Sequence, residues 1–126
     1  MTIKIGELAK RTGATVETIR YYEKERLLPE PFRSEGNYRL YNEEHIERLQ
    51  FILHCRTLDM ALDEVRILLE YWEEPDKDCG DVNLLLDKQI YAVEIRMEEL
   101  MHLKQHLTVL RQKCAGSAQA VSCGIL

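Results

Sequence analysis

The feature that most constrains this chain is a long apolar stripe in its second half. From Val82 onward, apolar residues recur in steps of three and four, the spacing that places side chains along one face of a helix. Lys104 stands where a strict heptad would continue, so the stripe shifts at that point. The stripe consists of Leu86, Ile90, Val93, Met97, Leu100, Leu103, Leu107 and Leu110.

A narrow stripe over roughly 30 residues cannot be covered by one short partner element. It suits a coiled coil between two chains, either parallel or antiparallel. We therefore expect a homodimer. The alternative is that the helix folds back on the N-terminal part of its own chain.

The N-terminal part is predicted to hold two short helices joined by a tight turn. The segment IGELAKRTG has apolar residues at helical spacing and ends at Gly13, a typical helix stop. Thr15 is a good N-cap for a second helix, VETIRYYEKERL. This pattern predicts a helix-turn-helix, although an ordinary helical hairpin has the same spacing.

The next segment, LLPEPFRSEGNYRLYNEE, is predicted to form a small β-hairpin, or wing. Pro29 and Pro31 break helical structure, and a Gly-Asn pair separates two short stretches that can pair as strands. Asn42 then caps a third helix, and a fourth helix, ALDEVRILLEYWEE, stops before Pro75. The chain is thus predicted to be mainly α.

Charge is divided unevenly along the chain, which has a net charge of -5. Residues 1 to 56 carry ten Lys or Arg and nine Asp or Glu, a net of +1, whereas residues 57 to 126 carry seven and thirteen, a net of -6. A nearly neutral first half can bind nucleic acid if its basic residues converge on one face. No signal peptide or membrane span is expected, so we predict a cytoplasmic protein whose four cysteines are reduced thiols, metal ligands or redox centres.

The stretches IGELAKRTG, IRYYEKERLL and FRSEGNYRLY together closely resemble the MerR family of transcriptional regulators. This resemblance implies a winged helix-turn-helix domain, a linking helical hairpin and a long antiparallel coiled-coil dimerisation helix. The corresponding division is a DNA-binding domain at residues 1–57, a connecting helix and loop at 58–80, a dimerisation helix at 81–113 and a metal-binding loop at 114–126.

The resemblance also implies which side chains contact DNA. Arginine and tyrosine on the recognition helix and wing engage phosphates, while the exposed start of the helix approaches base edges. We expect Tyr21 and Leu27, in contrast, to belong to the core. The matching phosphate-contact positions are Arg20, Tyr22, Arg33, Tyr38 and Arg39, with Arg56 as a further contact and Thr15, Glu17 and Thr18 at the start of the helix.

The cysteines suggest a metal site shared between subunits. Cys79 precedes the long helix and Cys114 closes it, so a rise of about 1.5 Å per residue separates the two by roughly 50 Å within one chain. Antiparallel pairing of two such helices brings Cys79 of one subunit beside Cys114 and Cys123 of the other. Cys55, inside the third helix, is predicted to be a buried structural thiol.

Three thiolates favour soft cations over Mg²⁺ or Ca²⁺, which require oxygen donors. The three-cysteine set resembles that of the mercury, lead and cadmium sensors of the family, whereas copper sensors carry serine at the position of Cys79. Zinc sensors have extra ligands where this chain has Ala115 and Gln119. We therefore expect Pb(II), with Cd(II), Hg(II) or Zn(II) as alternatives. A role for His102 and His106, four residues apart on the long helix, stays open.

The resemblance implies a regulator without catalytic activity. A homodimer would bind promoter DNA, and metal binding would distort that DNA so that RNA polymerase can start. The competing hypothesis is a thiol redox switch in which Cys114 and Cys123 form a disulfide. A drug-binding regulator is disfavoured because no length remains for a ligand domain, and an enzyme because no catalytic group set is found.

Overall fold

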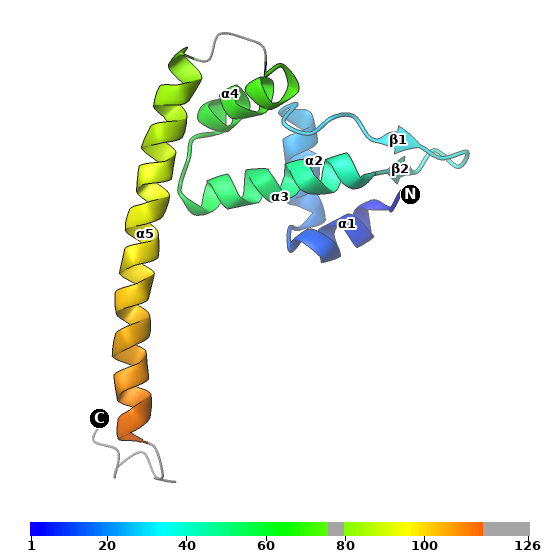
Figure 1. Cartoon of the computed structure of the whole chain (residues 1–126). Helices are drawn as coiled ribbons and strands as arrows, with labels where there is room; N and C mark the ends of the chain where they lie inside the picture. The colour runs from blue at the N-terminus through cyan, green and yellow to red at the C-terminus, as the bar shows by residue number, and fades with distance from the viewer. Residues whose placement is uncertain (76–79, 115–126) are drawn as a thin grey trace. The chain divides into compact units, whose positions relative to one another are not determined.

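The computed structural model describes residues 1–75 and 80–114 of the chain, apart from the side chain of Asp81. The chain forms two compact units, Met1–Val82 and Asn83–Leu126. The first unit contains four helices and a two-stranded sheet, and the second contains most of one long helix (Figure 1). The elements in chain order are α1 Ile5–Thr12, α2 Val16–Lys24, β1 Phe32–Arg33, β2 Arg39–Leu40, α3 Glu43–Thr57, α4 Leu62–Glu73 and α5 Gly80–Lys113.

The predicted helix starts are confirmed. Thr15 Oγ1 accepts a hydrogen bond of 3.1 Å from the Thr18 amide, which fixes the beginning of α2. Asn42 Oδ1 accepts a hydrogen bond of 3.2 Å from the His45 amide, and His45 Nδ1 accepts a hydrogen bond of 3.0 Å from the Asn42 amide. This reciprocal capping box fixes the beginning of α3.

The first three helices each end in a left-handed residue. Gly13 ends α1 with φ 80°, as its glycine predicts, whereas Arg26 after α2 and Asp59 after α3 have φ values of 60° and 58°. At the end of α2, the Arg26 amide donates a hydrogen bond to the Glu23 carbonyl, and the Leu27 amide donates one to the Tyr22 carbonyl. This pair of hydrogen bonds is the Schellman motif. Two helix ends therefore use this conformation without a glycine, at a cost in backbone energy.

The predicted wing is confirmed. Strands β1 and β2 are antiparallel and pair Phe32 with Leu40 and Arg33 with Arg39. A third pairing joins Ile3 to Tyr41 through two backbone hydrogen bonds of 2.8 Å, so the segment before α1 extends this sheet. The sequence does not predict this pairing, because the segment before α1 has no periodic pattern of its own.

The core of the first unit lies among α1, α2, α3, α4 and the wing. Leu8 on α1, Ile19 on α2 and Val65 on α4 are fully buried. His45, also buried, packs its ring edge-on against Phe32 and Tyr41, with centroids 5.9 and 5.2 Å apart. The fully buried large side chains are Leu8, Ile19, Leu27, Tyr41, Leu49, Ile52 and Val65.

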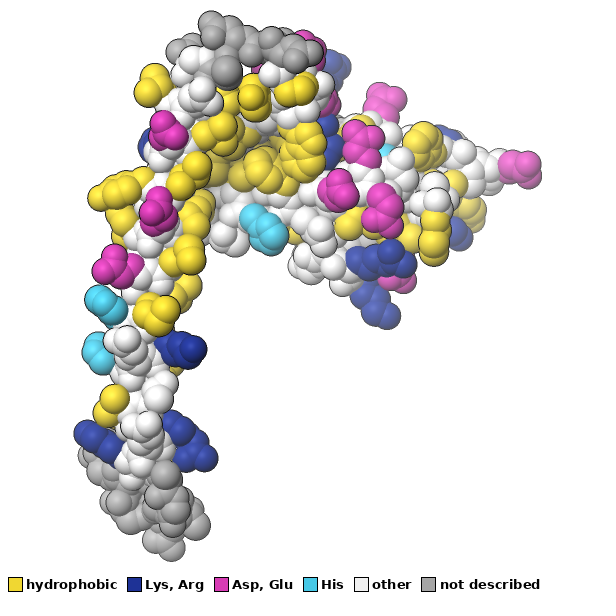
Figure 2. Space-filling model, viewed as in Figure 1, with side chains coloured by type: hydrophobic (Ala, Val, Ile, Leu, Met, Phe, Trp, Pro, Cys, Tyr) yellow, Lys and Arg dark blue, Asp and Glu magenta, His cyan; other side chains and the backbone are white. Residues whose placement is uncertain are grey.

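Helix α5 has 34 residues, so it is about 51 Å long. Hydrophobic side chains follow one another along it in Figure 2. None of the helices in the described part of the chain has the length and apolarity that a membrane span requires.

Two substitutions at helix ends should have opposite effects on stability. Gly13→Ala should lower the free energy of unfolding by about 1 kcal/mol, because a Cβ meets no atom within 4 Å and only the positive φ is penalised. Arg26→Gly should raise it by about 0.5–1 kcal/mol, because glycine tolerates the left-handed conformation. Urea unfolding of the purified protein measures both, and changes of the same sign would contradict this account.

Candidate nucleic-acid interface and metal site

Helix α2 and the wing together form a hollow lined mainly by basic residues. The hollow has a volume of about 400 Å³. Two of its basic side chains come from α2 and two from the strands, so the local charge favours an anion. The lining residues are Arg20, Glu23, Lys24, Glu30, Pro31, Arg33 and Arg39.

Glu23 connects α2, which the family resemblance makes the recognition helix, to the wing. Its Oε2 accepts a hydrogen bond of 2.7 Å from the hydroxyl of Tyr41, and its Oε1 lies 3.6 Å from Arg39 Nε, an ion pair without a hydrogen bond. Burial, together with the bond to Glu23, raises the pKa of Tyr41 above its usual range. The carboxylate thus fixes a wing arginine relative to α2.

The tip of the wing presents Tyr38, whose side chain is 61% exposed. Lys4 Nζ lies 4.7 Å from the centroid of the Tyr38 ring, a cation–π contact. Gly36 lies against the same ring, where a Cβ would stand 3.0 Å from a ring carbon. Arg33 Nη1 donates a hydrogen bond of 3.2 Å to the carbonyl of Asn37 in the turn. These contacts hold the exposed tyrosine and arginine of the wing in place.

The two adjacent tyrosines of α2 differ in burial from what the sequence predicts. Tyr22 is 7% exposed and belongs to the core, whereas Tyr21 is 48% exposed. The prediction that Tyr21 is a core residue is wrong, and Tyr22, expected on DNA, offers almost no surface. The reason is helical spacing, because Tyr22 lies three residues after the fully buried Ile19 on the same face of α2. Leu27 is buried as predicted.

The remaining expected DNA contacts lie on the surface or at its margin. Arg20 and Glu17 are exposed on α2. Thr15 Oγ1 caps the helix and also donates a hydrogen bond of 2.9 Å to Thr18 Oγ1, so these two hydroxyls already have partners at the helix start. Arg56 is exposed and its Nη1 donates to the carbonyl of Met60 just after α3.

The structure describes only part of the predicted metal site. Cys79 and Cys123 lie outside the described residues. Cys114 directly follows α5, is half-buried, and has its sulfur in a disulfide. Cys55 is buried as predicted, and this burial raises the pKa of its thiol, which disfavours the thiolate that a metal would bind.

Other metal-ligating clusters are not found in the described part. His102 and His106 are exposed on α5, and the residues that the structure describes contain no group of three or more His, Cys, Asp or Glu suited to a metal ion.

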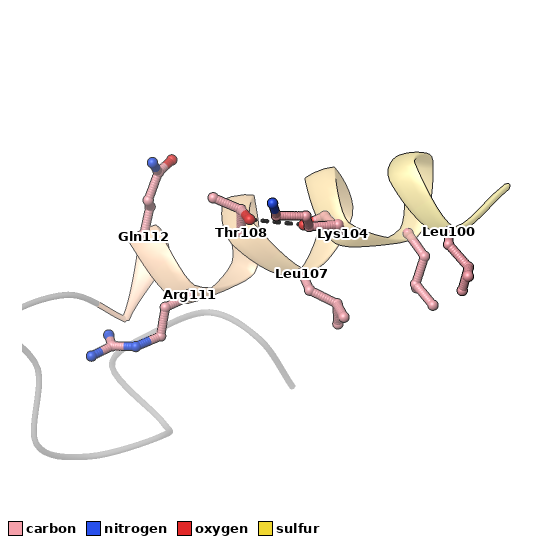
Figure 3. A pocket seen from close by; sticks show the side chains of 7 residues that line it. Leu100, Lys104, Leu107, Thr108, Arg111 and Gln112 are labelled. Carbon is pink, nitrogen blue, oxygen red and sulfur yellow. Dashed lines mark hydrogen bonds between the residues drawn. The ribbon is translucent and has the colours of Figure 1, made fainter. Parts of the chain in front are cut away.

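The apolar stripe predicted on α5 lies on its surface. Met97, Leu100, Leu103 and Leu107 are each more than half exposed. Leu100 and Leu107 project from the same side of the helix in Figure 3, and with neighbouring α5 residues they line a hollow of about 450 Å³. Thr108, which lines the same hollow, donates a hydrogen bond of 2.8 Å from its Oγ1 to the Lys104 carbonyl. An apolar stripe this long on a helix surface needs a covering partner.

Two family models match this chain. The model described as MerR HTH family regulatory protein matches residues 3–72, and the model described as MerR, DNA binding matches residues 46–110. The chain belongs to the MerR family. Together the two matches span the helix-turn-helix, the wing, α3, α4 and most of α5.

Curated relatives of this MerR-family chain are regulators. It is 50% identical over 111 residues to the HTH-type transcriptional regulator ZntR homolog of Haemophilus influenzae, covering 88% of this chain and 82% of that protein. It is 33% identical over 126 residues to the mercuric resistance operon regulatory protein of Bacillus cereus, covering 100% of this chain and 96% of that protein. The protein is therefore a transcriptional regulator and not an enzyme.

Solved structures agree with this fold. The transcription regulator PbrR691 from Ralstonia metallidurans CH34, in complex with lead(II), matches with 49% identity and a TM-score of 0.63, covering 98% of this chain and 96% of that chain. HiNmlR, a MerR family regulator bound to promoter DNA, matches with a TM-score of 0.70 at 22% identity, covering 100% and 98%. The second match supports the fold alone.

Tyr41→Phe tests the link between α2 and the wing in this MerR-family regulator. A hydrogen bond to a charged group contributes about 1.5–3 kcal/mol, so the free energy of unfolding at neutral pH should fall by about that amount. Folding raises the pKa of Tyr41, so Tyr41 contributes fully to the free energy of unfolding at pH values below its ordinary pKa of 10.0. This contribution is lost at higher pH, because there the tyrosine of the unfolded chain ionises readily and that of the folded chain does not. Urea unfolding should therefore show that the free energy of unfolding falls more between about pH 8 and about pH 11 for the wild type than for Tyr41→Phe. Equal losses would contradict the pairing.

Proposed function

We propose that this MerR-family regulator is metal-responsive and binds promoter DNA as a homodimer. In this proposal Pb(II) binds Cys79 of one subunit together with Cys114 and Cys123 of the other. Metal binding then distorts the promoter so that RNA polymerase starts transcription. The observation that carries the proposal is the exposed apolar stripe of α5, a helix with a cysteine directly beyond each end in the sequence.

The stripe supports the homodimer. Leu100, Leu103 and Leu107 leave more than half of their surface in water, which is unfavourable unless a partner of similar length covers them. A second copy of α5 supplies the same stripe and the same length. If the two copies run antiparallel, the end that follows Cys79 meets the end that precedes Cys114 of the partner, and a site made of both becomes possible.

Donor chemistry supports a soft metal. Three thiolates suit polarisable cations, and Pb(II) accepts three sulfur donors on one side because of its lone pair. Similarity does not distinguish the metals, since identity is 50% to the ZntR homolog and 49% to the lead-bound PbrR691. Ala115 and Gln119 supply neither thiolate nor imidazole, which favours lead over zinc.

The hollow between α2 and the wing supports DNA binding. A helix entering the major groove places its flank and the adjacent wing against the phosphate backbone. Arg20 from α2 and Arg33 and Arg39 from the wing converge on that hollow and would bind phosphate oxygens. The exposed side chain of Tyr38 extends the same surface. Tyr22 makes no such contribution in this proposal because it is buried.

A titration tests the metal site. Pb(II), Cd(II), Hg(II) and Zn(II) compete for the fully reduced protein under anaerobic conditions, and absorption by thiolate-to-metal transitions reports binding. We expect one Pb(II) per subunit, bound more tightly than Zn(II). Cys79→Ser should abolish binding and transcriptional response while promoter affinity persists, because the serine hydroxyl is a poor ligand for a soft cation.

Cys55→Ala is the matched control, because that thiol is buried in the first unit and should not affect metal binding. If Cys79→Ser loses promoter affinity instead of metal binding, Cys79 has a structural role and the proposed site is wrong. A monomer in sedimentation equilibrium would also refute it.

Arg20→Gln tests the DNA surface. Loss of one phosphate contact should weaken binding to specific and unrelated DNA alike, and should reduce the slope of log affinity against log salt by about 1. Arg96→Gln, which makes the same charge change on α5, should leave the slope unchanged. Fluorescence anisotropy over a series of salt concentrations measures both, and an unchanged slope for Arg20→Gln would remove this residue from the interface.

The disulfide at Cys114 favours a second candidate, the thiol redox switch. Oxidation of this cysteine would prevent it from binding metal. Transcription assays with peroxide in the absence of metal separate the two functions. A response to peroxide alone supports the switch, and a response to metal only in reduced protein supports the sensor.

A further inference from the structure

An arginine on α4 forms a hydrogen bond with the backbone at the C-terminal end of α2, the recognition helix. Arg66 on α4 donates a hydrogen bond from its Nη1 to the carbonyl of Glu25, the residue that caps the C-terminal end of α2. The two residues are 41 positions apart in the sequence. A guanidinium at this place also opposes the negative end of the α2 dipole.

The bond complements the backbone geometry at the end of α2. In the Schellman motif, the carbonyls of Tyr22 and Glu23 accept from the amides of Leu27 and Arg26. The Glu25 carbonyl accepts from Arg66 instead. The end of the recognition helix is therefore completed by a side chain from a different helix.

A second polar contact fixes the other end of α4. Glu73, the last residue of α4, accepts a hydrogen bond of 2.7 Å from Nη1 of Arg48 on α3. Arg48 is buried, with only 5% of its surface exposed. Arg66 and Glu73 are seven positions apart, two helical turns, so they lie on one face of α4. Both border a hollow of about 330 Å³ that is also lined by Arg26, Leu27, Arg48, Leu69 and Glu70. Helix α4 is thus held to α2 and α3 through one polar face.

We propose that Arg66 is a positioning residue that transmits movement of α4 to the recognition helix, and so determines the transcriptional response to metal. The inference rests on the proposed function. Cys79 follows Glu73 by six positions, so a metal bound at Cys79 acts on the chain directly beyond α4. A shift of α4 would then move the end of α2 through the Arg66 bond. Coupling of this kind requires that metal favour one arrangement of α4 over another.

Arg66→Met tests the inference, because methionine keeps an unbranched side chain of similar length in the hollow and removes the donor. The expected result is a ratio of transcription with and without Pb(II) that falls at least about fivefold, the lower end of ordinary allosteric coupling. Metal affinity and metal-free operator affinity should both match the wild type. The metal-dependent change in operator bending, measured by energy transfer between dyes at the DNA ends, should shrink in parallel.

Two further variants sharpen the test. Arg66→Lys keeps a cationic donor and should recover most of the response. Glu70→Gln changes a charge in the same hollow without removing the Arg66 bond, and should respond as the wild type does. Should Arg66→Met fail to fold, as judged by circular dichroism, Arg66→Leu takes its place, because leucine is also apolar and has no donor for the Glu25 carbonyl.

The outcomes separate the two hypotheses. A full response in folded Arg66→Met or Arg66→Leu overturns the role of Arg66, as does a loss of metal-free operator affinity equal to the loss of response. A wild-type protein that binds no metal, or shows no response to it, refutes the proposed function instead. Lost response with both affinities intact supports the coupling.

Discussion

A helix that exposes large apolar side chains along much of its length must be covered, and this requirement governs the protein. On α5, residues from Ile90 to Leu110 leave a large fraction of their apolar surface in water. The cost of that exposure grows with area and is removed only by a partner of comparable length. Pairing of α5 with a second copy would meet this requirement, and the predicted metal ligands beyond its two ends would then come together across two chains.

The first unit, Met1–Val82, is held together by polar contacts as well as by its apolar core. It is small, so its core is supplemented by polar contacts that join distant segments. Glu23 links the recognition helix to Tyr41 and Arg39 of the wing, and Arg66 links α4 to the end of the recognition helix. These contacts are directional, and they fix the orientation of elements that apolar packing alone would leave less defined.

Much of the fold follows from local signals in the sequence. Thr15, Asn42 and Gly13 mark helix boundaries because capping and positive φ depend on a few neighbouring residues, and the structure has each boundary where these residues predict it. The same holds for the wing turn. The apolar period of α5 likewise predicts a long helix, since one face recurs over many turns.

Features that depend on orientation or on distant contacts leave a weak signal in the sequence, or none. Tyr21 and Tyr22 are chemically identical neighbours, and only the direction of α2 against α1 and α3 determines which one is buried. The helical spacing from Ile19 to Tyr22 was the available signal. Arg66 and Glu25 meet across 41 positions through a backbone carbonyl, which leaves no trace in residue type. At the candidate site, the basic residues were identifiable by resemblance, whereas the contacts of Glu23 with Tyr41 and Arg39 are evident only in the folded chain.

The pairing of Ile3 with Tyr41 has a practical consequence for handling the protein. Residues directly ahead of Ile3 emerge beside the wing, and Lys4 already touches the ring of Tyr38. A purification tag fused at this end would place foreign chain next to the surface that is proposed to hold DNA. The opposite terminus carries Cys123, so an appended tag there would adjoin a proposed ligand. Protein for quantitative work is therefore best prepared with a removable tag, or with none.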